Sequence, residues 1–402
     1  MTFEFFYYMK ENIKQKCSAC GTSHISHNVL FISNIMEETI GKMGMYFFNF
    51  LQTKGLSKLS DFIEIFMYKL LEFFGFLHYN QDISKSASGR SELIWKEAQE
   101  RGIMMDQLVI FGRYTDYYRA KINDKFFYFE SLPIPLHFPQ KDYVWIDDKF
   151  ILSKKLEKKN IPVPKTKKVF SFWQARKHFE DFNKPVIVKP LSGSRGRHTT
   201  TNINDEKQLK IAFKLSKQIT PFLVISEHLF GSVYRATVID GKLVGFFRGD
   251  PPNVVGDGLR SIAELIDEKN IAHIGTTLSE IKISEDTLQF LQRQGHNLDT
   301  ILKNGETMDL SAKTGRMYGG YTKEMLPNIH PKMHEIFERA SRITEVPVLG
   351  FDLIIDDPTK DPDTQKWGII ECNSLPFIDL HYFAFEGTPI NLAKNVWDLW
   401  EK

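Results

Sequence analysis

The chain has 402 residues, and 52 lysines and arginines nearly balance 50 aspartates and glutamates, for a formal net charge of +2. This balance lacks the basic footprint of nucleic-acid-binding proteins, so we expect no nucleic-acid partner. Three cysteines are too few for a disulfide framework, which favours a reducing, cytoplasmic compartment. The first residues lack the features of a signal peptide, and no long apolar run predicts a membrane span or a membrane partner.

Residues 1–81 are predicted to form an N-terminal helical segment. Apolar side chains recur at helical spacing between Ile35 and Tyr79, which indicates two or three helices with a wide apolar face. We expect this face to pack on the main body of the chain, or on a second copy of the chain in a homo-oligomer.

A pair of cysteines in this segment has the residue type of a zinc site. Cys17 and Cys20 are well spaced for zinc, but His24 and His27 follow too closely for the usual finger geometry. We therefore favour incidental thiols in an exposed loop over a metal site.

Residues 82–146 are predicted to form a small α/β unit, because a helical pattern at 91–101 precedes apolar strands at 108–111 and 126–129. Two further helices are expected at 150–159 and 172–182. Residues 275–325 are polar and glycine-spotted, and we expect an irregular flap or acceptor-binding loop there.

The stretch from Pro185 to Thr201 is the most informative part of the chain. Three apolar residues form a short strand that delivers Lys189, and Pro190 ends the strand because it has no N–H to donate. The following loop is Ser192-Gly193-Ser194-Arg195-Gly196-Arg197, in which glycines can turn N–H groups toward an anion and arginines suit phosphate oxygens. The alternative is a glycine-rich hairpin tip with solvated charges. Neither the Walker pattern nor the dinucleotide pattern is present.

A β-hairpin is predicted from strands at 233–239 and 242–248 around an Asp-Gly turn. A two-residue turn places Arg235 opposite Phe246, which makes Arg235 and Arg248 diagonal neighbours on one face. Two neighbouring arginines repel each other unless an anion lies between them. A surface hairpin with spread charges is the alternative, but the apolar flanking residues favour an anion site.

Carboxylates mark two further strands. Asp352 lies within an apolar strand at 348–355, and Glu371 and Asn373 alternate along a partner strand at 367–373. A buried carboxylate is costly unless it is paired or binds a metal. A salt-bridged structural aspartate is one interpretation of Asp352, but three oxygen-bearing residues on facing strands favour Mg²⁺.

Taken together, these motifs resemble those of ATP-grasp ligases, and most closely the ATP-grasp modules of cyanophycin synthetase and bifunctional glutathione synthetase. The matching pieces, in chain order, are Asp148-Lys149, IPVP at 161–164, VKPLSGSRGR at 188–197, SEHLFGSVYR at 226–235, DPPNVVGDG at 250–258, GFDLIID at 350–356 and IIECNSLP at 369–376. The resemblance implies an α/β (α+β) class ATP-grasp fold. Two α+β subdomains, residues 147–225 and 226–402, would grip ATP, with 82–146 as a unit that precedes them.

The resemblance also implies roles for single residues. Those that hold ATP are Lys149 and Lys189 on the α- and β-phosphates, Ser192, Gly193, Ser194, Arg195, Gly196 and Arg197 over the γ-phosphate, and Glu227 with the backbone of His228 and Leu229 at the adenine edge. The catalytic arginines would be Arg235 and Arg248, and the Mg²⁺ ligands Asp352, Glu371 and Asn373. Two positions depart from the family: Val233 replaces an acid that reaches the ribose, and His198 replaces a glycine after the loop.

The function implied is that of an ATP-dependent carboxylate–amine ligase, which joins a small-molecule carboxylate and an amine through an acylphosphate. Amino acids or short peptides are the expected substrates. Two alternatives are an ATP-grasp kinase of small molecules and a nucleotide-binding partner protein without turnover.

Overall fold

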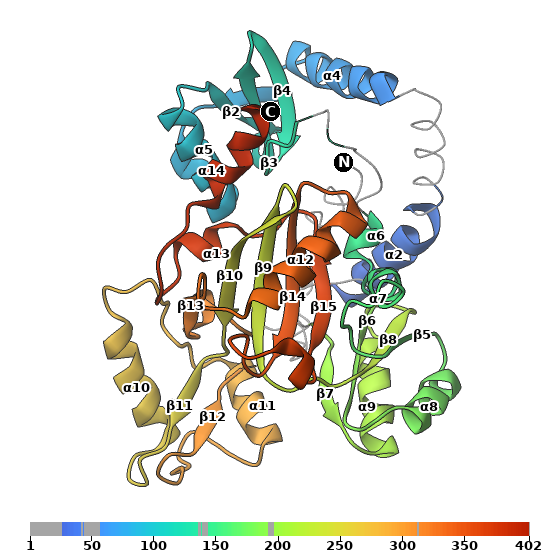
Figure 1. Cartoon of the computed structure of the whole chain (residues 1–402), viewed down its shortest axis with the longest axis vertical. Helices are drawn as coiled ribbons and strands as arrows, with labels where there is room; N and C mark the ends of the chain where they lie inside the picture. Colours follow the sequence, from blue (N-terminus) through green and yellow to red (C-terminus); the bar gives the residue numbers. More distant parts are fainter. Residues whose placement is uncertain are drawn as a thin grey trace.

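The computed structural model describes residues 26–41, 43, 57–135, 138, 144–191, 197–311 and 313–401. Figure 1 shows two four-stranded sheets, at the top and at the lower right, beside a five-stranded central sheet. A two-stranded sheet with two helices lies at the lower left. In the described part of the chain, no helix is both long enough and apolar enough to cross a membrane.

The first sheet is antiparallel in the order β1-β2-β3-β4. Its strands are β1 (Leu77–Asn80), β2 (Met105–Ile110), β3 (Arg113–Ile122) and β4 (Lys125–Glu130). Helix α5 (Gly89–Glu100) begins at Ser88, whose side chain accepts a hydrogen bond from the Ser91 backbone. The sheet therefore includes one strand before residue 82 and one strand, β3, that the sequence pattern did not predict.

The last described helices complete this first unit. Helix α14 (Leu392–Trp397) packs on α5, and the buried Trp397 indole donates a 3.0 Å hydrogen bond to the Ile94 carbonyl. Trp397 and Leu399 belong to the same buried cluster as Trp95 and Tyr118 of the first unit. The core of the first unit is thus built from segments about three hundred residues apart in the sequence.

The described part of the N-terminal segment contacts the body of the protein, but much of its apolar face stays exposed, including Ile32, Phe66 and Phe73, so the expected burial of that face is confirmed only in part. Helix α2 (His27–Met36) is followed by a π-helical turn, η1 (Glu37–Gly41), and Asn34 donates a 2.8 Å hydrogen bond to the Ile219 carbonyl. Helix α4 (Ser57–Phe73) lies against the first sheet, where Tyr68 is buried and stacks on Tyr128.

The sheet at the lower right of Figure 1 has the strand order β5-β8-β6-β7. Its strands are β5 (Thr166–Val169), β6 (Val186–Pro190), β7 (Thr200–Ile203) and β8 (Leu223–Glu227). Helices α8 (Phe172–Asp181) and α9 (Glu206–Ser216) cover this sheet through the buried Phe179, Leu209 and Phe213. Pro190 is the last residue of β6, as expected from its missing N–H group.

The central sheet has the order β13-β10-β9-β14-β15. Its strands are β9 (Ser232–Ile239), β10 (Lys242–Gly249), β13 (Thr322–Glu324), β14 (Val348–Ile355) and β15 (Gly368–Asn373). One face buries apolar side chains against α12 (Pro331–Thr344) and against α6 (Val144–Asp147) and α7 (Lys149–Glu157). The opposite face carries the polar residues of the candidate site, because side chains alternate between the two faces of a strand.

The expected hairpin and the expected pairing of 348–355 with 367–373 are both confirmed, but the hairpin register is different. A bulge between Leu243 and Gly245 shifts the pairing by one residue, so Arg235 lies opposite Phe247 and not opposite Phe246.

The region between residues 250 and 325 is more ordered than the sequence predicted. It contains β11 (Asn253–Val255), α10 (Ile262–His273), α11 (Glu285–Arg293), β12 (Thr307–Asp309) and a short 3-10 helix, η3 (Arg316–Tyr318). Strands β11 and β12 pair, and Val254, Ile262, Leu291 and Met308 form a buried cluster. Within 275–325 itself, α11, β12, η3 and β13 are regular and most of the other described residues are irregular, so the expectation of an irregular segment is wrong mainly for α11.

Candidate active site

Two lysines and one glutamate meet between the central sheet and the sheet that carries β6. Lys149 is the first residue of α7, which begins where the Asp148 carboxylate accepts hydrogen bonds from the backbone of residues 150 and 151. The Lys149 ammonium lies 3.3 Å from the Glu371 carboxylate on β15. Both charges act on Lys189 from β6, so residues 149, 189 and 371 converge from three elements.

The environment of Lys189 disfavours its charged form. Burial and, to a lesser extent, the neighbouring Lys149 ammonium together lower its pKa to about 8, and Glu371 only partly opposes them. Two ammonium groups held close together with one carboxylate leave an excess of positive charge. Such a place attracts an anion with several oxygens, such as a polyphosphate.

The polar face of the central sheet is organised by an ion pair between Arg235 and Asp352. The two residues are register partners on β9 and β14, and the guanidinium donates from Nε and Nη2 to the two carboxylate oxygens at 2.7 Å each. Burial alone would lower the pKa of Arg235, but Asp352, Glu371 and Asp379 outweigh it, so the pKa is raised. A Cβ at Gly350 would lie 2.7 Å from Pro376 and 3.6 Å from the Arg235 stem, which explains the glycine there.

The predicted metal ligands lie together on this face. Glu371 is the register partner of Asp352, and the Asn373 amide donates to Asp352 at 3.3 Å. Carboxylate and amide oxygens are the donors that Mg²⁺ prefers, and the set fits it chemically. Among the described residues, no three His, Cys, Asp or Glu side chains form a metal-binding group, and the predicted set has only two carboxylates. Its metal-binding role therefore stays a prediction.

The second arginine is not placed as predicted. With the bulge in the hairpin, Arg248 lies opposite Tyr234, whose side chain points into the apolar core on the other face from Arg235. The Arg248 guanidinium forms an ion pair with Asp250, with nitrogen–oxygen distances of 2.8 and 3.0 Å. The expectation that Arg235 and Arg248 are neighbours on one face is wrong, because the bulge inserts one residue between them.

The predicted adenine edge lies at the end of β8. Glu227 is buried, accepts a hydrogen bond from the Asn183 backbone and lies 3.5 Å from Lys366. The His228 backbone N–H donates to the Pro185 carbonyl at 3.0 Å, so this group is already used within the protein. The contact of Glu227 and of the backbone at Leu229 with a base stays a prediction.

The predicted phosphate loop is only partly described. Residues Ser192, Gly193, Ser194, Arg195 and Gly196 lie outside the described residues, as do Cys17, Cys20 and His24, while Arg197 begins the turn that leads into β7. His198 has a φ of +51°, in the left-handed region that favours glycine. Its ring nitrogen Nδ1 is 2.8 Å from the Leu215 carbonyl, which anchors the end of the loop.

Two groups of functional interest escaped the sequence analysis. His381 is fully buried and bridges Glu324, at 2.5 Å, and Thr237, at 2.7 Å, beneath the polar face. Asp379 is also buried and lies 3.8 Å from Arg316. No local motif marks these residues, because their partners come from distant segments.

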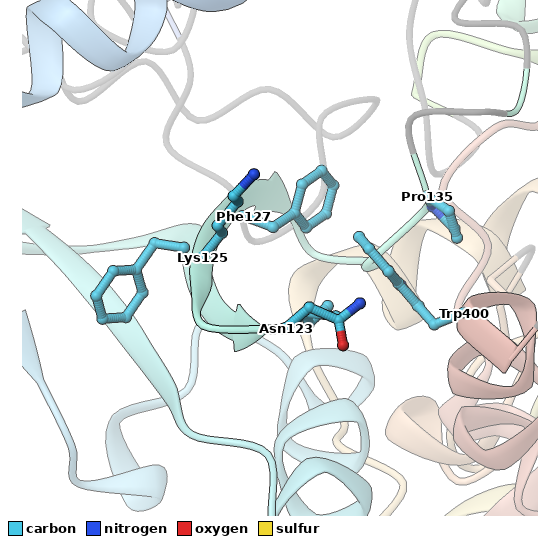
Figure 2. A pocket seen from close by; sticks show the side chains of 7 residues that line it. Asn123, Lys125, Phe127, Pro135 and Trp400 are labelled. Carbon is cyan, nitrogen blue, oxygen red and sulfur yellow. The ribbon is translucent and has the colours of Figure 1, made fainter.

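A separate hollow of about 480 Å³ lies on the first unit, lined by the β3–β4 turn, Phe127, Pro135 and Trp400 (Figure 2). The Phe127 and Trp400 rings meet edge to face at 4.8 Å. Its lining is mostly apolar, and it shares no residue with the candidate site.

Known proteins resemble this chain over much of its length. It is 34% identical over 224 residues to the cyanophycin synthetase of Geminocystis herdmanii, which covers 54% of this chain and 25% of that protein. It is 29% identical over 266 residues to the bifunctional glutathione biosynthesis protein of Clostridium perfringens, which covers 63% of this chain and 34% of that protein. No protein-family model matches the chain.

The crystal structure of a bifunctional glutathione synthetase from Pasteurella multocida matches with a TM-score of 0.54 and 24% identity, over 78% of this chain and 44% of that one. The chain has an ATP-grasp fold. The resemblance expected from the motifs is thereby confirmed. This chain spans about a quarter to a third of the length of the curated relatives named above.

Proposed function

We propose that the protein is a Mg²⁺- and ATP-dependent ligase that joins a carboxylate to an amine. The observation that carries the proposal is the meeting of Lys149, Lys189 and Glu371 beside the Arg235–Asp352 pair. Two ammonium groups suit the phosphates of ATP, and the carboxylates suit a divalent cation. The similarity to cyanophycin synthetases and bifunctional glutathione synthetases supports the same proposal.

In the proposed complex, Lys149 and Lys189 hold the α- and β-phosphates and the 192–197 loop covers the γ-phosphate. Asp352, Glu371 and Asn373 would hold Mg²⁺, which neutralises charge on the phosphate oxygens. Arg235 would stabilise the charge that develops during transfer. By the strand register, Arg248 lies on the other face of the sheet. We therefore propose a structural role for it, in the ion pair with Asp250 at the end of the hairpin.

The proposed reaction has two steps. The donor carboxylate attacks the γ-phosphorus of ATP, which forms an acylphosphate and releases ADP. The acceptor amine then attacks the acyl carbon, phosphate leaves, and the nitrogen loses a proton as the amide forms. Because an acylphosphate hydrolyses in water, the loop has to exclude water during the reaction. Amino acids or short peptides are the proposed substrates.

A screen of ADP release tests the proposal. Amino acids and dipeptides are supplied singly and in pairs with ATP and Mg²⁺, and products are identified by mass spectrometry. We expect ADP and an amide only when a suitable carboxylate and amine are both present. A phosphorylated product from a single compound would instead identify a kinase. ATP binding without ADP release from any pair would identify a binding protein.

A pair of variants sharpens the screen. Glu371→Gln removes a proposed metal ligand, and Glu180→Gln changes an exposed glutamate on α8. We expect the first to be inactive and the second to retain wild-type activity. Equal activity of both variants would contradict the assignment of the site.

A further inference from the structure

Asp379 has unused hydrogen-bonding capacity in a buried place. The side chain is 10% exposed, and among the described residues its Oδ1 atom has no hydrogen-bond partner. Its Oδ2 atom lies 3.8 Å from Arg316, and a Cβ built on Gly89, the first residue of α5, would lie 2.9 Å from that atom. A buried carboxylate oxygen without a partner is costly, so its retention calls for a ligand.

Arg316 offers the complementary group. Its guanidinium lies over the Phe383 ring at 4.6 Å, and its buried Nε–H has no acceptor among the described residues. The ion pair with Asp379 is long, which leaves both groups able to bind something between or beside them. Within the described part of the chain, two neighbouring side chains therefore offer one unused acceptor and one unused donor.

Arg90 and Phe377 border the same place. The terminal nitrogens of Arg90 bind the Leu375 carbonyl, Asp116 and Ser131, and its guanidinium lies 5.2 Å from the centre of the Phe377 ring. Arg90 thus joins the first unit to the segment that follows β15, and its buried Nε–H, like that of Arg316, has no acceptor among the described residues.

The cluster adjoins the proposed phosphoryl-transfer site. The charges of Asp379 and Arg235 act on each other, and Arg235 is bound to Asp352. Burial raises the pKa of Asp379, although Arg316, Arg90 and Arg235 each oppose that shift.

The charges of the cluster select the ligand. Arg90 pairs with Asp116, Arg235 with Asp352 and Arg316 with Asp379, so the cluster is neutral. A lone anion or cation would add an uncompensated buried charge, and neither would use both the free oxygen of Asp379 and the free N–H groups of Arg316 and Arg90. A ligand with one ammonium and one carboxylate adds no net charge and uses both.

We propose that Asp379 and Arg316 bind the acceptor amino acid, with its ammonium on the Asp379 carboxylate and its carboxylate on the Arg316 guanidinium. The inference rests on the proposed ligase function and names the class of its amine substrate. It also assigns a role to part of the 275–325 segment.

Calorimetry with chemically truncated ligands tests the subsite. The full chain with Mg²⁺ and the non-hydrolysable analogue AMPPNP is titrated with each of the twenty common amino acids, and the best binder is then compared with its methyl ester and its N-acetyl form. We expect Arg316→Gln to weaken the amino acid about tenfold or more but to leave the ester nearly unchanged. Asp379→Asn should weaken the amino acid but leave the N-acetyl form nearly unchanged.

Two outcomes would overturn the proposal: no amino acid binds, or each variant weakens the intact and truncated ligands equally, as a purely structural role predicts. Arg316→Lys and Asp379→Glu keep the charges and replace the first variants if those fail to fold, with the same comparison of ligands. Arg260→Gln, at a partly exposed arginine, is the matched control. AMPPNP is not turned over, so this titration does not depend on catalysis. If an amino acid binds with the expected dependence on the variants but no pair of compounds releases ADP, the subsite stands and the proposed ligase function is contradicted.

Discussion

Arg235 and Asp352 face each other across β9 and β14 and form two hydrogen bonds of 2.7 Å. The sequence assigns one of them to phosphate and the other to a metal, but they form a single electrostatic unit. If Asp352 binds a metal ion, the Arg235 guanidinium needs another anion. If Arg235 binds phosphate, the Asp352 carboxylate needs another cation. We therefore expect metal and nucleotide to bind this protein cooperatively.

Asp352→Asn tests the ion pair through the stability of the protein. The substitution leaves a mostly buried guanidinium without its counter-ion, and the expected loss in the free energy of unfolding is about 3 kcal/mol or more. Urea unfolding followed by circular dichroism measures the loss. Arg235→Met in the same protein should recover part of it, because no unpaired buried charge then remains. A loss below about 1 kcal/mol for the single variant would show that the pair is solvated.

Glu371→Gln separates metal binding from nucleotide binding. We expect turnover to be abolished and ATP affinity to fall less, because the amide keeps one oxygen while the charge that suits Mg²⁺ is lost. Steady-state ADP release and calorimetry with ATP measure the two effects. Asn373→Asp, which keeps an oxygen ligand, should retain more activity than Glu371→Gln. Full activity of Glu371→Gln would sink the metal assignment.

Lys189→Met is expected to weaken ATP binding by about 30-fold or more, because truncation of one member of a desolvated charge pair costs about 2–5 kcal/mol. Methionine keeps much of the apolar stem, so the fold should survive. Titration of ATP into both proteins with Mg²⁺ present measures the difference. Lys154→Met, on the same helix as Lys149 but partly exposed, is the control. Equal affinities would mean that Lys189 is an ordinary strand-end lysine.

The lowered pKa of Lys189 makes ATP binding depend on pH. At pH 8 about half of the Lys189 side chains lack a proton, and phosphate charges raise the pKa, so ATP binding should take up as much as about half a proton. ATP affinity should fall as pH rises above 8. The stability of the protein without ATP should rise between about pH 8 and 10.5, since the unfolded lysine binds more protons there.

Calorimetry in two buffers of different ionisation enthalpy measures the proton uptake at pH 8. Lys189→Met should lose most of it. Uptake that is unchanged in this variant would assign the proton to another group.

Removal of residues 1–80 should give an aggregating protein. The deletion removes β1 and exposes the edge of β2, and it also removes Tyr68 and Leu77, which bury Leu108. Size-exclusion chromatography with light scattering detects the aggregates. A deletion of residues 1–56 keeps α4 and β1 and should remain soluble. A soluble and fully active product of the longer deletion would show that the segment is an independent appendage.

The sequence predicted the elements whose signal is local. Helix α8 begins at residue 172 as predicted and ends one residue before the predicted end, and Ser171 and Gln174 form a capping box at its start. The pairing of β14 with β15 also follows from two apolar runs that carry alternating carboxylates. These features need no information from distant residues.

The hairpin register could not be read in this way. The bulge lies near Gly245, where a Cβ would come within 2.5 Å of the His381 ring, so the backbone there adapts to a segment more than a hundred residues away. Strand β3 was missed for a related reason. Of its ten residues only Tyr118 and Ala120 are buried, and charged residues interrupt the alternation.

The same dependence on distant segments explains why Asp379 and Arg316 escaped notice. They lie 63 residues apart in the sequence, and each is unremarkable in its own neighbourhood. They are distinguished by one buried polar atom in each side chain that has no partner among the described residues, Asp379 Oδ1 and Arg316 Nε.

The packing of α14 on α5 has a consequence for how the protein is made. Synthesis on the ribosome proceeds from the N-terminus, so the first sheet and α5 emerge long before Trp397 and Leu399. Until those residues arrive, the surface that they cover on Ile94 and Phe129 is open to water and to other nascent chains. We therefore expect the nascent first unit to depend on a chaperone, which would cover this apolar surface and prevent aggregation until translation reaches α14.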